Sequence, residues 1–385
     1  MQVYFDNAAT TPVHPLVFEK MKPFLTGDFG NPSSSHSFGR KTRVAIEDAR
    51  ETIAWIINAN PGEIYFTSGG TEANNFSIRG IVEEEFHESG RKKIITSNSE
   101  HHCVLDVFEM LGKNGFESKF IKIDNTSSPD LNELSALIGE SVSFVSNIHV
   151  NNETGTINPI EKISGIVNNK TTYLHTDAVQ SFGKLKIDVK KLGVSSLCAS
   201  SHKINGPKGA GFSFIKSGTP VHPLIIGGSQ ERNRRGGTEN VAAIIGFAEA
   251  AKIAVKEIDE NYSHTKKLRS SFTDGIKSIA GDRIRINGGD YTLPNILSFS
   301  FISDFFNNDA ESMLMFLDIN GIAASNGAAC TSGTWKPSHV IINSGYSKED
   351  ASGTIRFSFG KQNTFEEIEY SLEILSKMVK KFEKK

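Results

Sequence analysis

The chain has little cysteine, almost no excess of charge and no long apolar run. Three cysteines among 385 residues, Cys103, Cys198 and Cys330, are too few and too odd in number for a disulfide framework, and their spacing matches no Cys-x-x-Cys metal pattern. A formal net charge of −2 offers no electrostatic footprint for nucleic acid or an acidic membrane surface. Because no signal peptide or membrane span is recognisable, we expect a cytoplasmic protein.

The middle of the chain alternates short apolar runs with amphipathic stretches of roughly ten to fifteen residues. The predicted strands are residues 64–67, 93–96, 117–123, 142–147, 172–176, 194–199 and 211–215. Strands and helices that alternate in this way predict an α/β fold with a largely parallel sheet. Ligands of such sheets bind at the carboxyl ends of the strands, so the polar residues that follow each run are the candidates for a site.

The pattern changes after residue 240. A long helical stretch, which is one helix or two, precedes two strands and a final amphipathic helix, at residues 241–279, 295–301, 355–359 and 365–382. We therefore expect two domains. The large domain comprises residues 15–258, and the smaller one comprises residues 1–14 and 259–385.

Residues 200–211 join two apolar runs and hold a histidine, two lysines and several glycines. A lysine on a tight turn after a buried strand can have a desolvated amine, whose lowered pKa frees the lone pair for Schiff-base chemistry. Lys203 directly follows His202 at the strand end and is the candidate, whereas Lys208 belongs to the turn. The alternative is a glycine-rich surface turn with two solvated lysines.

The run Ser-Gly-Gly-Thr-Glu at residues 68–72 follows a predicted strand and opens a helix. Free N–H groups and the positive end of the helix dipole suit a phosphate there, and the Thr71 hydroxyl can donate to it. The run is neither a P-loop nor a Gly-x-Gly-x-x-Gly motif. The alternative is an ordinary glycine turn with Thr71 as N-cap.

Three more polar residues follow predicted strands. His101 can stack on a planar ring, bind a metal or be structural, and the absence of a His-Glu-x-x-His motif argues against zinc hydrolysis, so we expect no metal site. Asn152 lies in an amide-rich run that can hold a carboxylate or a ring hydroxyl. Asp177 can stay ionised beside a cationic ring nitrogen, the partner that a pyridinium electron sink needs, or it can be a helix N-cap.

Cys330 is the one cysteine that resembles a nucleophile, because small residues surround it from 327 to 333. Cys103, on a helix face, and Cys198, in an apolar run, are interpreted as inert core thiols. A phosphate cradle, a ring-stacking histidine, an aspartate for a ring nitrogen and a Schiff-base lysine fall at successive strand ends. One small molecule needs all four, pyridoxal 5'-phosphate.

The chain also resembles the class-V, fold-type I pyridoxal-phosphate enzymes and, within them, the cysteine desulfurases of the NifS/IscS kind. The resemblance covers nearly the whole chain and implies a mostly parallel sheet in a large domain with a smaller α+β C-terminal domain. The motifs that carry it are Asp-Asn-Ala-Ala-Thr-Thr (6–11), Gly-Asn-Pro-Ser-Ser (30–34), Thr-Ser-Gly-Gly-Thr-Glu-Ala-Asn-Asn (67–75), Glu-His-His (100–102), Asn-Asn-Glu-Thr-Gly (151–155), Asp-Ala-Val-Gln (177–180), Ser-His-Lys-Ile-Asn-Gly-Pro-Lys-Gly (201–209), Arg-Gly-Gly-Thr-Glu-Asn (235–240), Ala-Ala-Cys-Thr-Ser-Gly (328–333) and Thr-Ile-Arg-Phe-Ser (354–358).

The resemblance implies a role for each matching residue. Lys203 would carry the cofactor as a Schiff base and then move the Cα proton, and Cys330 would attack the substrate sulfur. His101, also counted as catalytic, would stack on the cofactor ring, while Asp177 would pair with its nitrogen and Gln180 with its oxygen. The implied phosphate contacts come from Gly70, Thr71, Ser200, His202 and, from the second subunit of a homodimer, Thr238.

The substrate carboxylate would be held by Asn152, which also touches the cofactor, and by Arg356, whose fork binds carboxylates bidentately. The implied reaction converts L-cysteine to L-alanine and leaves a persulfide on Cys330. The sulfur would then pass to an acceptor protein. An iron–sulfur scaffold is the expected acceptor, and tRNA thiolation and DNA phosphorothioation machinery are the alternatives.

Two features depart from the family pattern. The residues before Cys330 are not the frequent Ser-Ser-Gly-Ser-Ala, and the chain ends at Lys385 without the longer tail of some iron–sulfur-assembly members. Two other functions stay open at this point. An aminotransferase or selenocysteine lyase of the same fold needs no Cys330, and a cofactor-free sulfur carrier would need neither Lys203 nor Asp177.

Overall fold

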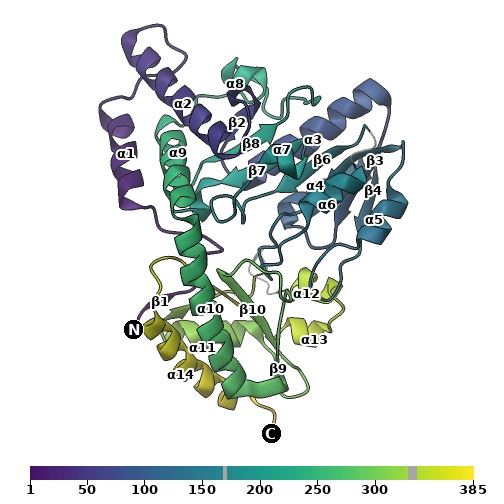
Figure 1. Ribbon diagram of the computed structural model, residues 1–385, viewed down its shortest axis with the longest axis vertical. Helices are drawn as coiled ribbons and strands as arrows, with labels where there is room; N and C mark the ends of the chain where they lie inside the picture. Colours follow the sequence, from purple (N-terminus) through teal and green to yellow (C-terminus); the bar gives the residue numbers. More distant parts are fainter. Residues whose placement is uncertain (168–170, 328–335) are drawn as a thin grey trace.

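The computed structural model describes residues 1–167, 171–327 and 336–385 (Figure 1). Its largest sheet has seven strands in the order β2-β8-β7-β6-β5-β3-β4. These strands are β2 (Ile64–Thr67), β3 (Lys93–Ser97), β4 (Glu117–Ile121), β5 (Val142–Ser146), β6 (Tyr173–Asp177), β7 (Ser196–Ser200) and β8 (Gly211–Ile215). The pairs from β4 across to β7 are parallel, and β8 lies antiparallel between β7 and β2. The predicted α/β fold with a mostly parallel sheet is confirmed.

Helices pack on both faces of this sheet because neighbouring residues of a strand point to opposite sides. Ile94 and Phe144 pack in a cluster with residues of α3 (Gly70–Ser89) and α4 (His102–Lys113). Ile95 and Val145, the next residues along, pack in a second cluster on the other face. That second cluster includes residues of α2 (Ser37–Ile56), α6 (Ile160–Val167) and α9 (Val241–Lys256).

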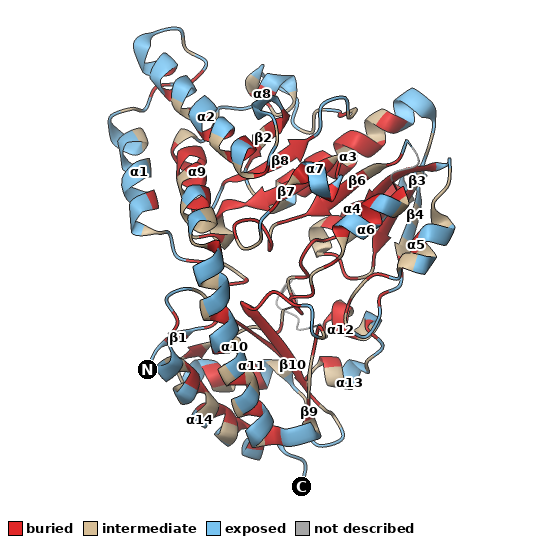
Figure 2. Cartoon of the chain, in the orientation of Figure 1, coloured by how far each residue is buried: buried red, intermediate tan, exposed pale blue. Residues whose placement is uncertain are grey.

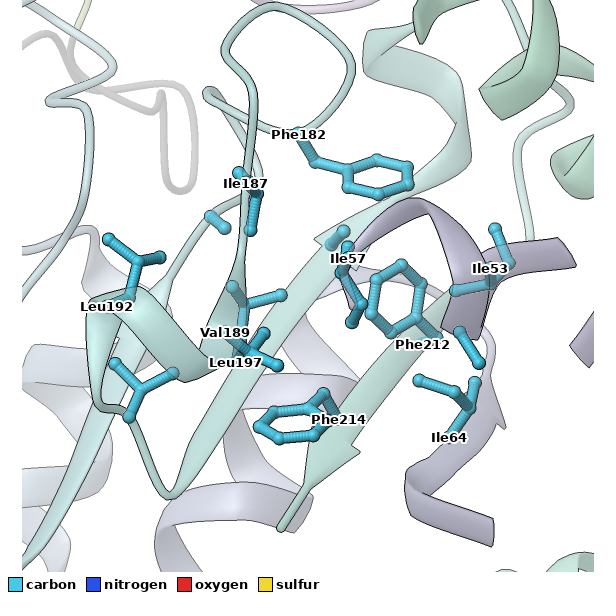
Figure 3. Packing of buried hydrophobic residues seen from close by; sticks show 14 of the residues in the cluster. Ile53, Ile57, Ile64, Phe182, Ile187, Val189, Leu192, Leu197, Phe212 and Phe214 are labelled. Atoms are coloured by element: carbon cyan, nitrogen blue, oxygen red, sulfur yellow. The ribbon is translucent and has the colours of Figure 1, made fainter. Parts of the chain in front are cut away.

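The second cluster also fixes the segment that follows β6. Figure 3 shows Phe182 and Ile187 lying close to Phe212 and Leu197 of β8 and β7. Phe182 makes edge-on ring contacts with Phe212 and with Phe247, whose centroids lie 5.2 Å and 5.8 Å away. The segment that follows β6 is therefore anchored by its packing in the hydrophobic core.

The part of the molecule drawn lowest in Figure 1 contains both termini. An antiparallel sheet there has the order β12-β10-β9, and a parallel pair joins β1 to β11. The strands are β1 (Val3–Tyr4), β9 (Ile284–Ile286), β10 (Ile296–Phe301), β11 (Ile322–Ala323) and β12 (Thr354–Ser358). Val3 and Phe5 are buried in one cluster with Leu268, Phe299 and Phe357, so the first residues of the chain pack with its C-terminal part.

The two parts are joined by the predicted stretch 241–279, which consists of two helices. α9 ends at Lys256, and α10 (Ile258–Ala280) follows after Glu257, whose φ and ψ are −100° and 5°. α2 begins at Ser37, where His36 caps it by accepting the N–H of Gly39 at 3.3 Å. The remaining helices are α1 (Pro15–Thr26), α5 (Leu131–Leu137), α7 (Val189–Leu192), α8 (Gln230–Asn233), α11 (Ala310–Ile319), α12 (His339–Asn343), α13 (Lys348–Ala351) and α14 (Phe365–Phe382).

Burial follows the layers of the fold. The inner strands of the large sheet are almost entirely buried, the edge strand β4 is largely exposed or half-buried, and the outer faces of α1, α2 and α10 are exposed (Figure 2). In the described ranges, none of the helices is both long and apolar enough to cross a membrane. The same residues contain no group of three or more His, Cys, Asp or Glu side chains placed to hold a metal ion.

Candidate active site

A cavity of about 340 Å³ lies at the carboxyl ends of the parallel strands. It is bounded by residues from β6, β7, α3, β12 and the N-terminal segment. The predicted site residues that line it are Gly70, Thr71, His101, Asn152, Asp177, Gln180, Ser200, His202, Lys203 and Arg356. The fold thus brings together residues that are spread over most of the chain.

Lys203 ends a 3₁₀ turn, η2 (Ser201–Lys203), that directly follows β7. Its amine donates to the carbonyl oxygens of Ala8 and Ala9, both at 2.7 Å. Burial lowers the pKa of Lys203 to about 8, with a further lowering by the nearby Arg356 cation, while Asp6 and Asp177 act in the opposite direction. About a tenth of the amine is therefore uncharged at pH 7, far more than for an ordinary lysine, and this uncharged form is the nucleophile.

Asp177 is the last residue of β6 and is only 3% exposed. Its carboxylate accepts the N–H of Val179 at 2.8 Å and the Nδ2–H of Asn74 at 2.8 Å. Hydrogen bonds to a carboxylate favour its ionised form. The carboxylate can therefore face a cationic ring nitrogen across the cavity.

A buried hydrogen-bond chain stands behind Asp177. Asn74 donates an amide hydrogen to Asp177, which leaves the Asn74 Oδ1 as an acceptor. This oxygen lies 2.8 Å from His175 Nε2 and 3.0 Å from Cys198 Sγ. Burial lowers the pKa of His175 to about 3, so the ring is neutral and carries its one hydrogen on Nε2. Nδ1 of His175 then accepts from the Ser196 hydroxyl at 2.8 Å. Each donor in the chain points toward Asp177.

His101 is the N-cap of α4 and lines the same cavity. Its Nδ1 accepts the N–H of Cys103 at 3.1 Å, and burial lowers its pKa, with Asp177 opposing the shift. A neutral imidazole that accepts at Nδ1 keeps its hydrogen on Nε2. Burial also raises the pKa of the Cys103 thiol well above its ordinary value, in keeping with an inert thiol.

The N-terminus of α3 forms one wall of the cavity. Gly70 has no room for a side chain, since a Cβ there would meet Val179 Cγ2 at 2.7 Å and Ser200 Cβ at 3.7 Å. The N–H groups of a first helical turn have no partner within the helix, and Gly70 and Thr71 of this turn line the cavity together with Ser200 and His202. Burial lowers the pKa of His202 to about 4, and the cation of Lys203 adds to this. The wall suits an anion such as a phosphate.

Arg356 comes from β12, on the other side of the cavity. Its Nη1 donates to the Asn152 carbonyl at 2.7 Å and its Nη2 to Asp6 at 2.9 Å. Its buried Nε has no hydrogen-bond partner among the described residues. A buried guanidinium with an unused N–H is costly without a partner, and a substrate carboxylate would supply one.

One predicted site residue that the structure describes is not in this cavity. Thr238 lines a different one, beside Ser68 and Arg235. Cys330 lies outside the described residues.

The sequence missed three residues that the structure places beside the candidates. Asn74 lies one helical turn after Gly70, so helical spacing could have placed it on the same face. His175 lies two residues before Asp177 on β6, where alternation places both side chains on one side. Asp6 could not have been found, since its partner Arg356 is 350 residues away.

Comparison with known proteins agrees with this geometry. The sequence profile of the class-V aminotransferases matches residues 3–370. The chain is 44% identical to cysteine desulfurase IscS of Dictyoglomus turgidum over 382 residues, which cover 99% of this chain and 95% of the relative. It is 41% identical to cysteine desulfurase IscS 1 of Archaeoglobus fulgidus, over 98% of this chain and 97% of the relative.

Solved structures give the same result. A NifS-like protein with 37% sequence identity superposes with a TM-score of 0.91, over 99% of this chain and 100% of that one. A NifS-like protein from Rickettsia africae, 31% identical, gives a TM-score of 0.87 over 99% and 100% of the two chains. The fold and site are therefore those of a class-V aminotransferase-type enzyme. Within that class, the chain belongs to the family of the IscS and NifS-like cysteine desulfurases, and the predicted resemblance is confirmed.

Proposed function

We propose that the protein is a pyridoxal-phosphate-dependent cysteine desulfurase that converts L-cysteine to L-alanine and a persulfide on Cys330. The observation that carries the proposal is that Lys203, with its lowered pKa, and the buried Asp177 line one cavity together with Arg356, whose Nε is unused. Names of relatives at about 40% identity over nearly the full chain support the same reaction.

The residues of the cavity fit pyridoxal 5'-phosphate. Lys203 offers the amine for its attachment, Asp177 the anion for its ring nitrogen, and Gln180 an amide for its ring oxygen. Gly70 has no side chain, so a phosphate can approach the backbone N–H groups at the start of α3. The phosphate ligands in this proposal are Gly70, Thr71, Ser200 and His202. When bound, this cofactor supplies an electron sink for the pair left on Cα after an amino acid loses its Cα proton.

The chain's own residues bind and orient the substrate. Arg356 donates to the substrate carboxylate from its guanidinium N–H groups, one of which, at Nη2, is bonded to Asp6 and another, at Nη1, to the Asn152 carbonyl. His101 presents a neutral ring over the cavity, with its hydrogen on Nε2. Lys203, once its amine is free, takes the Cα proton at Nζ, because its lowered pKa leaves a lone pair near neutral pH.

Sulfur transfer uses Cys330. Its thiolate forms a bond to the substrate sulfur as the carbon–sulfur bond breaks. The electron pair of that bond stays with the substrate carbon, which is then protonated to give alanine. The persulfide sulfur passes to an acceptor protein, for which an iron–sulfur scaffold is our proposal, and the reaction belongs in the cytoplasm.

A homodimer completes the proposed site. Thr238 does not line the cavity that holds Lys203, so a contact from Thr238 to the phosphate has to be made in the partner subunit. Large apolar side chains of α1, α2 and the loop between them are exposed, with Leu16 at 61% and Phe29 at 71%. Such a surface favours burial against a second copy.

The test is incubation of the purified, cofactor-loaded protein with L-cysteine and a reductant, with alanine and sulfide scored together. We expect equal amounts of both products. Cys330→Ala should retain the cofactor's colour and lose the sulfur transfer. Undiminished sulfide from that variant would contradict the mechanism and favour a lyase that needs no cysteine nucleophile.

A further inference from the structure

Lys184 lies next to the proposed cofactor site and has no part in the reaction described above. It lines a second cavity, of about 90 Å³, which Lys203 also lines. Lys203 lines both cavities, whereas Gln180 lines the first one only. Lys184 follows Gln180 by four residues, and the two side chains touch.

A continuous run of hydrogen bonds links Lys184 to Lys203. Lys184 Nζ donates to Gln180 Oε1 at 3.2 Å, and Gln180 Nε2 donates to the Ala8 carbonyl at 2.8 Å. The same carbonyl accepts from Lys203 Nζ at 2.7 Å. The Gln180 amide is therefore held at both ends, since the Ala8 carbonyl can only accept and the amine of Lys184 donates. One N–H of the amide is left for the cofactor side.

The backbone holds Lys184 rigidly in this place. Gly183 has a φ of +72°, and a Cβ there would meet Ile204 Cγ2 at 2.9 Å and Ala254 Cβ at 3.0 Å. The backbone at Gly183 therefore packs directly on Ile204, the residue that follows Lys203. Phe182 and Ile187, on either side of Lys184 in the sequence, point into the core (Figure 3).

The charge on Lys184 has no carboxylate partner within 4.0 Å among the residues that the structure describes. Burial, and then the neighbouring cations of Lys203 and Arg356, lower the pKa of Lys184 to about 7. The other titratable side chains that line its cavity are His14, Glu257, Tyr262 and Lys361. Of these, Glu257 is paired with Lys361 at 2.9 Å. Burying the Lys184 amine without a carboxylate partner costs free energy, and its hydrogen bond in this place is the one that it donates to Gln180.

We propose that Lys184 is a positioning residue that fixes the Gln180 amide against the bound cofactor and, through it, tunes the protonation of the nitrogen of Lys203. The proposal rests on the proposed use of pyridoxal 5'-phosphate, but not on turnover of cysteine. Without Lys184, Gln180 Oε1 loses its donor inside the protein, and the amide is held only by Ala8. The lost donor favours the protonated form of the Lys203 nitrogen.

The test compares Lys184→Met with Lys184→Arg and with a control, Lys186→Met. Lys186 lies two residues away, and its exposed amine pairs with the exposed Asp259 at 3.0 Å. The pH midpoint of the visible absorbance is measured on each protein loaded with pyridoxal 5'-phosphate. We expect Lys184→Met to raise the midpoint by about one pH unit, a tenfold change in proton affinity. Lys184→Arg, which still donates, should shift it less, and Lys186→Met should leave it unchanged.

A second measurement needs no loaded enzyme. In the cofactor-free protein, the pH dependence of Lys203 acylation, read by mass spectrometry of its peptide, should shift in the same direction in Lys184→Met. Because Lys184 acts through Gln180, the shift should disappear when Lys184→Met is added to Gln180→Leu. Midpoints in Lys184→Met equal to those of the unmodified protein would overturn the proposal. A protein that binds the cofactor but forms no alanine would instead contradict the proposed function.

Discussion

Lys203 and Lys208 are five residues apart in the sequence, but their side chains lie in different surroundings. Lys203 lines the cavity and donates to two carbonyls of the N-terminal segment, whereas Lys208 is exposed in the turn that follows. Only Lys203 is therefore desolvated enough for the chemistry of a Schiff base.

We predict that Lys203→Ala abolishes attachment of the cofactor that borohydride can fix. Alanine formation should fall by at least about a hundredfold, the low end of what a positioned acid–base group contributes. Lys208→Ala should retain both. Peptide mass spectrometry after reduction locates the modified lysine, and a modified Lys208 would show that the assignment is wrong.

His149 gives a prediction about pH. It is 7% exposed, its Nδ1 has no partner among the described residues, and burial lowers its pKa to about 4. Because an unfolded histidine binds a proton near pH 6.5, the folded state loses stability as the pH falls from about 6.5 toward 4. Between pH 7 and pH 5 this loss is about 2 kcal/mol.

The variant His149→Gln should show a smaller fall in unfolding free energy between pH 7 and pH 5, by about the same 2 kcal/mol. Chemical denaturation at pH 7, 6 and 5 measures it, and the comparison of slopes is independent of any constant change in stability. The same slope in both proteins would mean that His149 is protonated in the folded state.

The sequence analysis identified functional residues that lie directly after predicted strands, because a position at the end of a strand is enough to make a polar residue a candidate. Lys203, Asp177 and His101 were predicted on this ground and share one cavity. Asn74, His175 and Lys184 were not predicted, since their importance comes from hydrogen bonds to those residues. Neither the tautomer of His175 nor the anchoring of Gln180 is visible until the neighbouring atoms are placed.

At the scale of elements, the start of α3 depends on Gly70. A Cβ at this position would lie 2.7 Å from Val179 Cγ2, so Gly70→Ala should destabilise the protein by about 1–3 kcal/mol and weaken cofactor binding. Gly165→Ala is the matched control within α6, because nothing lies within 4 Å of the added carbon. The control should be neutral or stabilise by about 0.5–1 kcal/mol.

Thermal unfolding and cofactor titration of the two glycine variants measure these effects. Equal stability and equal cofactor affinity in Gly70→Ala and Gly165→Ala would contradict the role given to the close approach of α3 and Val179.

The short helix α8 is held by a buried ion pair. Glu231 accepts both Nη groups of Arg50, at 2.7 Å and 2.8 Å, and also the N–H of Phe66 at 2.9 Å. Three successive residues from Glu231 have positive φ, at 43°, 55° and 62°, a conformation that costs free energy outside glycine. The pair therefore fixes a strained segment that leads toward Thr238.

Glu231→Gln leaves the buried Arg50 without its counter-charge and should lower the unfolding free energy by about 3–5 kcal/mol. Glu47→Gln removes the exposed partner of the same arginine, 3.2 Å away, and should cost less than about 1 kcal/mol. Denaturant titration of both variants provides the measurement. A loss in Glu231→Gln no larger than that in Glu47→Gln would show that the buried pair does not anchor α8.

Element types were predicted more accurately than element ends. Residues 211–215 form the predicted strand, because an apolar run and its flanking turns mark it. The start of α2 at Ser37 depends on capping by His36, which is not one of the usual N-cap residue types. The break at Glu257 depends on packing of two helices against different parts of the molecule.

At the scale of the whole molecule, the division into residues 15–258 and residues 1–14 with 259–385 stays a prediction. Its support is the buried cluster in which Val3 and Phe5 pack with Leu268 and Phe357. The wide spread of the site along the chain has a consequence for prediction. Arg356 and Asp6 are hydrogen-bonded only because β1 joins the C-terminal part of the fold, and no local pattern contains that information.

The central claim is that this fold uses Cys330 to take sulfur from L-cysteine. The most direct measurement is mass spectrometry of the Cys330 peptide after the loaded protein is mixed with L-cysteine in the absence of reductant. We predict one added sulfur atom on Cys330, removable by reductant, with release of an equal amount of alanine. Release of alanine and sulfide while Cys330 stays unmodified, or persulfide found only on Cys103 or Cys198, would contradict the claim.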